Sequence, residues 1–317
     1  MVARGSGARL STGTRSRRWL VGARIVGLGV GALAALTGCS VGHVFRGFGW
    51  PEEGITPQAH EMYKLWIGAV VAALVTGVFV WGLIFWCVVR YRKNSDELPP
   101  QTRYNMPIEI LYTVAPVLVI AVLFYYTAVT QSYVDKLSAK PDVAIGVVAF
   151  QWNWEFDYLN PDALDDKKQP LPVLGANGKP LATVGASDYI PVLVVPTHRS
   201  ILFIETSKDV VHSFWVPEAL FKRDVIPGLP PEQRNRFEVT SIEKEGSYVG
   251  HCAELCGAYH SMMNFEVRAV SPEKYQAFIA ARKAGMSTPE ALTSIGEKPL
   301  ATSTHPFDTD PTKRSAS

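Results

Sequence analysis

Soft metal-binding side chains are concentrated in residues 250–263. Cys252, Cys256, His260 and Met263 follow the pattern C-x3-C-x3-H-x2-M, which places two thiols, an imidazole and a thioether in one loop. A second imidazole, His212, lies earlier in the chain, in the sequence Val-Val-His-Ser-Phe. Because sulfur and imidazole ligands select copper or zinc over hard cations, this set predicts a transition-metal site.

The methionine and the second cysteine distinguish between kinds of metal site. Structural zinc sites do not recruit methionine, so Met263 favours copper. A single blue-copper site takes two histidines, one cysteine and a weak axial methionine, which would leave one cysteine over. If both thiolates bridge two coppers, each copper needs two further ligands. These would be His212, His260, Met263 and one backbone carbonyl, which we expect to be that of Glu254.

The sequence alone leaves other interpretations of these residues open. A C-x3-C pair in an exported domain is often a disulfide, and a lone histidine on a strand is often structural. His251 adjoins Cys252, but neighbouring residues of a strand point to opposite faces, so we exclude it from the ligand set. All the donors taken together favour the copper pair.

The donor set also indicates the kind of chemistry. Bridging thiolates would let two coppers share one electron, so the geometry would change little on reduction and electron transfer would be fast. The pattern supplies neither an open coordination position nor an acid–base pair. We therefore expect this chain to carry electrons rather than to transform a substrate.

Two apolar runs would anchor this site to a membrane. Residues 65–89 and 108–127 are each long enough to cross a bilayer, which requires about 20 helical residues. The first run has no charged residue, and the second has only Glu109, at its start. The intervening segment 90–107 is basic, which places it in the cytoplasm and the rest of the mature chain outside. Its cationic residues are Arg90, Arg92, Lys93 and Arg103.

The first 38 residues are typical of an export signal. Five arginines precede an apolar stretch over residues 19–36, and small residues follow it. The sequence Leu-Thr-Gly-Cys, ending at Cys39, looks like a bacterial lipoprotein box, so we expect cleavage, lipidation of Cys39 and an outer segment over 39–64. An uncleaved first membrane helix is the alternative. The net charge of +2 gives no indication of nucleic-acid binding.

The exported part begins at about residue 142 and has the pattern of short strands. Runs of β-type residues between turn residues extend to residue 270 and predict a β-sandwich or Greek-key barrel. Within it, residues 159–188 predict a long insertion that contacts a partner or is disordered. Residues 271–285 predict a helix that begins at Ser271 and Pro272, and residues 286–317 a flexible tail.

The two spans followed by this metal loop resemble subunit II of the haem-copper cytochrome c oxidases. The lipoprotein box and the sequence Tyr-His-Ser-Met-Met-Asn-Phe at 259–265 are most similar to the actinobacterial aa3-type branch. The resemblance covers residues 65–270. It implies an α+β membrane protein in which a two-helix transmembrane hairpin precedes an extracytoplasmic, cupredoxin-like Greek-key β-barrel with a binuclear copper centre, CuA.

The resemblance also implies roles for single residues. In Gln-Trp-Asn-Trp at 151–154, Trp152 corresponds to the electron entry point, although Phe150 departs from the histidine common before that glutamine. The side chain of Glu254 corresponds to one that reaches a magnesium ion shared with subunit I. Glu109 corresponds to the mouth of the K proton channel, with an interfacial helix carboxylate as the alternative.

The resemblance further implies a set of partners. These are subunit I with haem a, haem a3 and CuB, the other oxidase subunits, and a c-type cytochrome or a haem c domain of a neighbouring bc1-type complex. Oxygen reduction would belong to subunit I. A copper-delivery lipoprotein would not need paired spans, a quinol oxidase subunit would lack the copper ligands, and a nitrous oxide reductase would need a further large domain.

Overall fold

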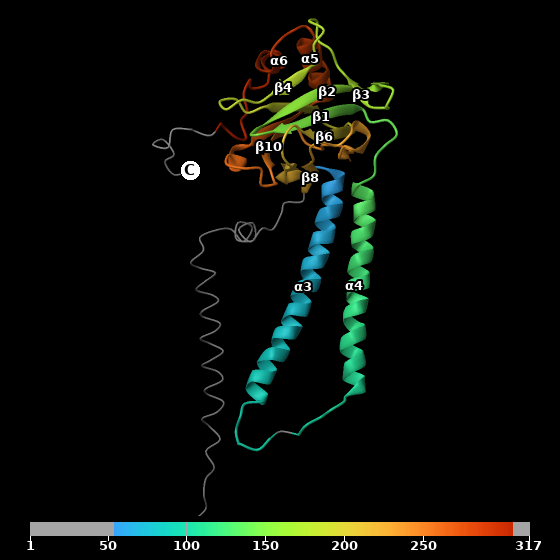
Figure 1. Cartoon of the computed structure of the whole chain (residues 1–317), viewed down its shortest axis with the longest axis vertical. Coiled ribbons are helices and arrows are strands. Elements are labelled where there is room, and N and C mark those ends of the chain that lie inside the picture. Colours follow the sequence, from blue (N-terminus) through green and yellow to red (C-terminus); the bar gives the residue numbers. More distant parts are fainter. Residues whose placement is uncertain (1–53, 99, 307–317) are drawn as a thin grey trace, which may run out of the picture. The chain divides into compact units, whose positions relative to one another are not determined.

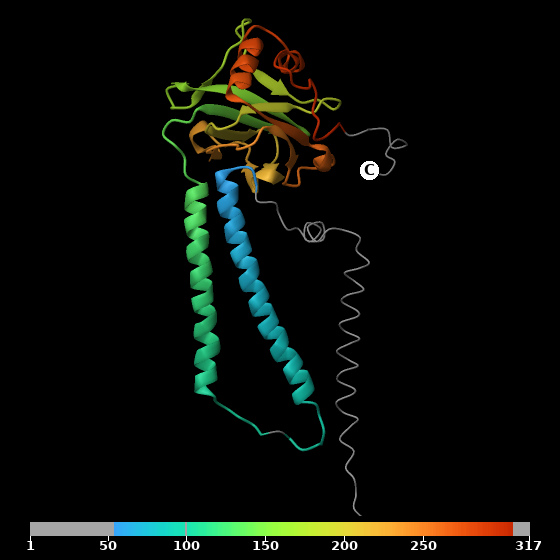
Figure 2. The ribbon, with the colours of Figure 1, turned by 180° about the vertical axis from the view of Figure 1, so that it is seen from behind.

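The computed structural model describes residues 54–98 and 100–306 (Figure 1). The predicted signal sequence and Cys39 lie outside the described residues. The described part of the chain comprises two long apolar helices followed by a β-domain, as Figure 2 shows from behind. Two apolar helices long enough to cross a membrane, followed by a β-domain, agree with the expected fold class.

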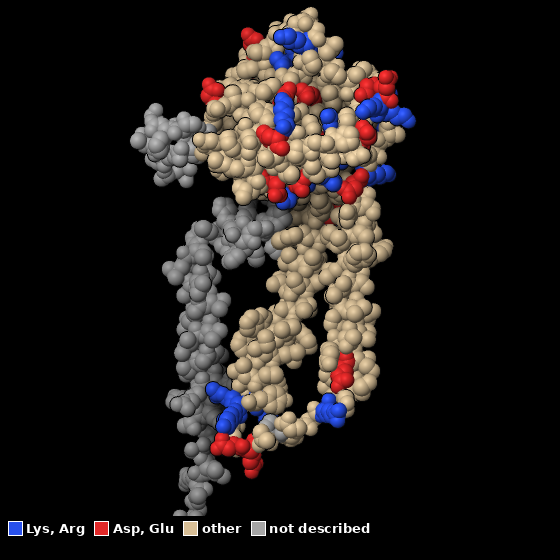
Figure 3. All heavy atoms as spheres, viewed as in Figure 1, with Lys and Arg blue, Asp and Glu red and all other residues tan. Residues whose placement is uncertain are grey.

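Helices α3 (Pro57–Arg90) and α4 (Met106–Val134) are long and apolar enough to cross a membrane. Figure 3 shows the charged side chains on the β-domain and near the connection between the helices, with few on the helix faces between. The helices contain the predicted spans 65–89 and 108–127 and extend beyond them. At its N-terminus α3 is capped by Thr56, whose side chain accepts a hydrogen bond from the backbone N–H of Ala59.

The ends of both helices are bonded to the β-domain. The Gln58 side chain donates to the hydroxyl of Thr240 at 2.5 Å. Beyond the end of α4, Arg223 donates to the carboxylate of Asp135 at 2.6 Å. These polar contacts lie outside the apolar runs, which explains why the helices continue past the length predicted from hydrophobicity alone.

The β-domain consists of two sheets. The first sheet has the order β3-β2-β1-β6-β9, with β4 also paired to β2, and the second has the order β5-β11-β10-β7-β8. The pairs β1–β6 and β5–β11 are parallel, and the other pairs are antiparallel. The strands are β1 (Val143–Phe150), β2 (Asn153–Leu164), β3 (Pro170–Pro172), β4 (Ala182–Val184), β5 (Val192–Pro196), β6 (Ile201–Ser207), β7 (His212–Val216), β8 (Phe221–Val225), β9 (Arg236–Val239), β10 (Gly246–Cys252) and β11 (Asn264–Val270).

An aromatic core lies between the two sheets. Phe214 of β7 stacks on Phe265 of β11, with ring centroids 4.6 Å apart. Trp154 of β2 meets the edges of both rings and is itself fully buried. β7 and β10 carry the predicted ligands His212 and Cys252, and β11 begins directly after Met263, so this core fixes the strand ends next to the predicted ligands.

The predicted insertion 159–188 is more regular than its composition indicates. Strand β2 continues to Leu164, and β3 and β4 both return to pair with β2. The carboxylate of Asp165 accepts hydrogen bonds from the backbone N–H groups of Lys167 and Gln169, which closes the turn between β2 and β3. Prolines are tolerated here because β3 is an edge strand.

The predicted flexible tail from residue 286 also differs from the structure. After α5 (Pro272–Lys283), helix α6 (Thr288–Ser294) begins with a capping box between Ser287 and Glu290. Leu292 of α6 is fully buried. The tail has few large apolar residues, but its capping signature and this one leucine suffice to dock a short helix.

The segment that follows α6 is held in place by a buried ion pair on β11. The Glu266 carboxylate pairs with the Arg268 guanidinium, and both side chains are buried. Glu266 also accepts hydrogen bonds from the backbone N–H groups of Thr302 (2.5 Å) and Ser303 (2.7 Å). Arg268 donates to the backbone carbonyl of Leu300 at 3.2 Å. Residues 297–306, which we call the C-terminal strap, are therefore fixed by two side chains of one strand.

We predict that Glu266→Gln loosens the strap. Burial raises the pKa of Glu266, but the N–H groups of Ser303 and Thr302 and the Arg268 guanidinium outweigh it and hold the pKa below its usual value. The stabilisation is therefore present above the unfolded-state pKa and is lost as the pH falls through the folded-state pKa. Arg268 then loses its buried carboxylate partner and keeps only Glu297, 3.5 Å away, so the cost should be about 3 kcal/mol, the lower end for breaking a buried pair. Limited proteolysis of the full chain should cut the strap faster in the variant, and an unchanged rate would contradict the prediction. Asp166→Asn, at an exposed turn, is the control.

Candidate metal centre

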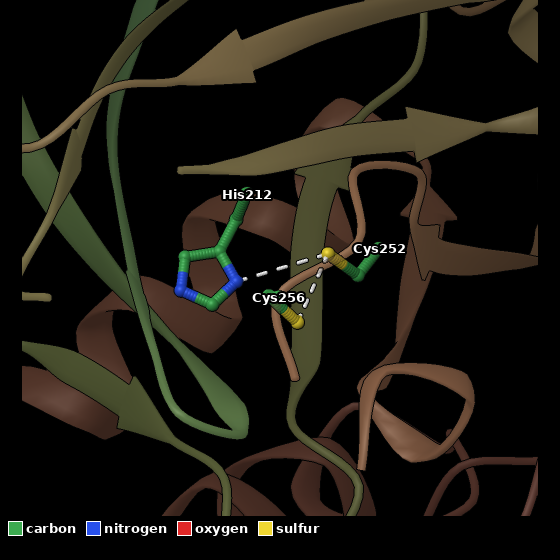
Figure 4. Close-up of side chains that lie close together, drawn as sticks. All are labelled: His212, Cys252 and Cys256. Atoms are coloured by element: carbon green, nitrogen blue, oxygen red, sulfur yellow. Dashed lines mark hydrogen bonds between the residues drawn. The ribbon is translucent and has the colours of Figure 1, made fainter. Parts of the chain in front are cut away.

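Three of the predicted ligands meet where β7 begins and β10 ends. His212 is the first residue of β7, Cys252 is the last of β10, and Cys256 lies in the loop that follows (Figure 4). The Nδ1 atom of His212 lies 3.8 Å from the Cys252 sulfur. The sulfurs of Cys252 and Cys256 are also 3.8 Å apart. All three side chains are buried, so the group is shielded from water.

The remaining predicted donors lie close to the sulfurs of the two cysteines. The Cys256 sulfur lies 3.6 Å from Nδ1 of His260 and 3.9 Å from the sulfur of Met263. The Cys252 sulfur lies 3.3 Å from the backbone carbonyl oxygen of Glu254. The structure therefore brings all six predicted donors together, five from side chains and one from the backbone.

His251 lies outside this group, as strand alternation predicts. Its Nδ1 atom is 2.8 Å from the side-chain oxygen of Asn264, on the neighbouring strand β11. Its ring packs near Trp215, with centroids 5.9 Å apart. The partners of His251 are therefore on the opposite side of β10 from the Cys252 sulfur.

The sulfur separation distinguishes a metal site from a disulfide. A disulfide requires sulfur atoms about 2.05 Å apart, whereas those of Cys252 and Cys256 lie at 3.8 Å and both cysteines are free. Two thiols, two imidazoles and a thioether in a buried pocket match the ligand preferences of copper. The donors present fit a copper centre.

The two thiols differ in acidity because they share one pocket. Burial raises the pKa of Cys252, but hydrogen bonds with His212 and with backbone at Glu254 outweigh it and lower the pKa to about 7. Burial and the neighbouring Cys252 thiolate raise the pKa of Cys256 to about 12. The pair thus keeps one proton near neutral pH, and binding a metal with both thiolates must release it.

The loop between the cysteines is held from the other sheet. The carbonyl oxygen of Cys256 accepts hydrogen bonds from the Gln151 amide at 2.8 Å and from the Trp152 indole at 3.1 Å. Gly257 has a φ of +121°, and a β-carbon there would come within 3.2 Å of the Trp152 ring. The close approach of the indole therefore requires glycine at this position. The Trp154 indole similarly donates to the carbonyl of Met263, at 3.1 Å.

One residue of the site is absent from the sequence-based prediction. An oxygen of the Asp209 carboxylate lies 2.9 Å from Nε2 of His212. This contact fixes the ring so that Nδ1 faces the sulfurs, which is how carboxylates orient metal-binding imidazoles. The available signal was a carboxylate three residues before a histidine at the start of a strand.

Glu109 lies apart from the metal centre, in the first turn of α4. Its carboxylate accepts a hydrogen bond from the backbone N–H of Asn105 at 2.9 Å. That contact is the one expected of a carboxylate at a helix N-terminus. Within the described residues, it ties Glu109 to its own helix.

We predict that Asp209→Asn weakens metal binding. Asparagine retains the size of the side chain but loses the charge that stabilises and orients His212, so affinity should fall about 10- to 100-fold. Competition of the loaded protein against a graded copper chelator measures this. Asp188→Asn, an exposed aspartate outside the site, should leave the affinity unchanged. Equal copper affinities in the two variants would contradict the orienting role of Asp209.

Two family models match the chain: "Cytochrome C oxidase subunit II, periplasmic domain" over residues 143–270 and the corresponding transmembrane domain over residues 49–128. A probable cytochrome c oxidase subunit 2 of Nocardia farcinica is 47% identical, over 98% of this chain and 94% of that protein. Cytochrome c oxidase subunit 2 of Mycobacterium tuberculosis H37Rv is 46% identical, over 88% and 87% of the two chains.

A solved structure, the periplasmic domain of subunit II of cytochrome oxidase of Bradyrhizobium japonicum, is 25% identical over 46% of this chain and 97% of that one, with a TM-score of 0.33. The two family models and the high identity over nearly the whole length agree with the resemblance predicted from the metal loop and paired spans. The chain belongs to the cytochrome c oxidase subunit II family.

Proposed function

We propose that this chain is the electron-entry subunit of a respiratory haem-copper oxidase. It would accept electrons from a c-type cytochrome at a two-copper centre and pass them to haem a of subunit I, where oxygen reduction is coupled to proton translocation. The observation that carries the proposal is the convergence of two thiols, two imidazoles and a thioether at separations of 3.6–3.9 Å. A quinol-using relative would not need these ligands.

The ligands would be His212, Cys252, Cys256, His260, Met263 and the carbonyl of Glu254. A copper pair bound there supplies a one-electron carrier. The protein's contribution is rigidity. His212 and Met263 are fully buried, and the indoles of Trp152 and Trp154 donate to two carbonyls of the loop, so water is excluded and the ligands would not need to move when an electron arrives.

Electrons would enter through Trp152. Its indole is half-buried and donates a hydrogen bond directly to the carbonyl of the proposed ligand Cys256. The ring also lies edge-on to Tyr259, with centroids 4.9 Å apart, next to the proposed ligand His260. This gives a short path of bonds and ring contacts from the surface to the metal loop.

The exposed side chain of Glu254 would face subunit I and bind a shared magnesium ion, while its carbonyl faces the copper pair. Replacing magnesium with manganese in the assembled oxidase and recording the manganese EPR signal tests this. Loss of the signal in Glu254→Gln is expected, and an unchanged signal would exclude the contact.

Both mature termini and the β-domain would lie outside the bacterial plasma membrane, with Cys39 lipidated. The support is the basic segment between the helices, which is typical of a cytoplasmic loop. Mass spectrometry of the mature N-terminal peptide tests the lipid, because an unmodified or uncleaved peptide would exclude it.

We predict that Cys252→Ser abolishes the two-copper centre. In the assembled oxidase, the wild-type chain should hold two coppers and give an EPR signal from one electron shared between them. Serine removes one of the two thiolates that would hold the copper pair, so that signal should disappear and the copper content should fall. Cys87→Ser, in α3, is the matched control and should change neither. One bound zinc in the wild-type chain would contradict the proposed function.

We predict that Glu109→Gln slows turnover of the assembled oxidase if Glu109 is the mouth of a proton channel. Glutamine can keep the hydrogen bond from Asn105 but cannot carry a proton, so turnover should fall about 100-fold, the lower end of general acid–base effects. The copper EPR signal should be unchanged. Normal turnover in the variant would leave Glu109 as a helix-terminal carboxylate only.

A further inference from the structure

The C-terminal strap, residues 297–306, runs from the end of α6 toward the metal loop. Its first part is tied to β11 by Arg268, which donates to the carbonyl of Lys298 at 3.2 Å, and by Glu266. Glu297 adds an ion pair with Lys274 of α5 at 2.6 Å. In Figure 1 the red end of the chain passes the edge of the domain toward the orange loop after β10.

The far end of the strap forms part of a surface pocket beside the metal loop. Pro306 lines this pocket, of about 430 Å³, together with Trp152, Tyr259 and Met262. Tyr259 and Met262 each precede a proposed ligand in the sequence, and the Trp152 indole donates to the carbonyl of a third. The pocket is therefore a place where a bound group would come close to the proposed copper centre.

The lining indicates what kind of group this pocket fits. It is made by aromatic and apolar side chains, two amide side chains and small residues, with no lysine, arginine, aspartate or glutamate among them. The other lining residues are Phe150, Gln151, Asn153, Gly185, Ala186, Ser187 and Ile190. An uncharged wall of this composition suits the apolar, exposed edge of a protein-bound redox group better than a charged small molecule.

We propose that the C-terminal strap is part of the docking surface for the electron donor, with Pro306 forming part of the wall of the pocket at Trp152. The occupant is the apolar edge of the haem-bearing donor protein. This inference rests on the proposed function, which supplies the need for such a donor. It adds a segment that lies outside the residues matched by the family's domain models.

The Glu266 contacts explain how a short irregular segment can define a wall. The backbone N–H groups of Thr302 and Ser303 are held by one buried carboxylate, and the Ser303 hydroxyl donates to it as well, at 2.9 Å. Only two residues of the chain separate this anchor from Pro306 in the pocket lining. Glu266 itself lies on β11, which begins directly after Met263. The wall and the metal loop are thus attached to the same strand.

Two truncations of the chain in the assembled oxidase test the proposal. One ends at Ser303, which keeps the anchor and removes the wall, and the other ends at Pro306, which keeps both. Oxygen uptake is measured with soluble, chemically reduced cytochrome c, and copper reduction with hexaammineruthenium(II), which needs no protein docking surface. Trp152→Phe serves as the reference for an impaired entry point and should lower kcat with cytochrome c.

We expect the chain ending at Ser303 to show a KM for cytochrome c raised about threefold or more, with kcat nearly unchanged, because binding contacts are lost. The chain ending at Pro306 should behave as the full chain, and reduction by the small complex should be equal in all three. Equal KM values for the two truncations would overturn the proposal, as would slower reduction by the small complex in the shorter chain. Absence of a two-copper EPR signal in the full chain would refute the proposed function and this inference together, whereas a normal signal with an unchanged KM refutes the strap alone.

Discussion

The arrangement of the metal loop depends on one carbonyl group. The oxygen of Cys256 accepts hydrogen bonds from Gln151 and Trp152, which belong to the connection between β1 and β2 in the opposite sheet. These bonds hold the middle of the loop after β10 against the other sheet. In this arrangement the two sulfurs lie side by side, 3.8 Å apart. The aromatic core between the sheets serves the same end, since it sets the distance from which Trp152 reaches across.

The cluster of soft donors was predictable from the sequence because softness and spacing are properties of the residues themselves. The paired spans were predictable because a bilayer imposes a length on any apolar helix. Asp209 was not, since its role depends on which nitrogen of His212 faces the sulfurs, and only the folded geometry decides that. The same holds for Glu266 and Arg268, whose burial on β11 follows from strand register and from what covers them.

Two segments are more ordered than their composition indicates, for a common reason. Composition rich in proline, glycine and small polar residues predicts irregular chain, both at residues 159–188 and after residue 286. In the structure, the first is ordered by the pairing of β3 and β4 with the adjoining strand β2. The second is ordered by burial of Leu292 and by hydrogen bonds to the Glu266 carboxylate on β11. The local sequence does not indicate these partners. The capping box at Ser287 indicates only that a helix begins there.

The unbonded sulfurs also constrain the order of events in making the protein. A buried pair at 3.8 Å, with one thiol already acidic, is poised to oxidise, because only a small movement separates it from a disulfide. The domain that carries the pair lies beyond the membrane, where oxidation of thiols is favoured. If the pair binds copper as proposed, a newly exported chain has to take up the metal before its thiols oxidise, and an oxidised chain must first be reduced. Maturation of the proposed site would then be a competition between a metal supply and an oxidant.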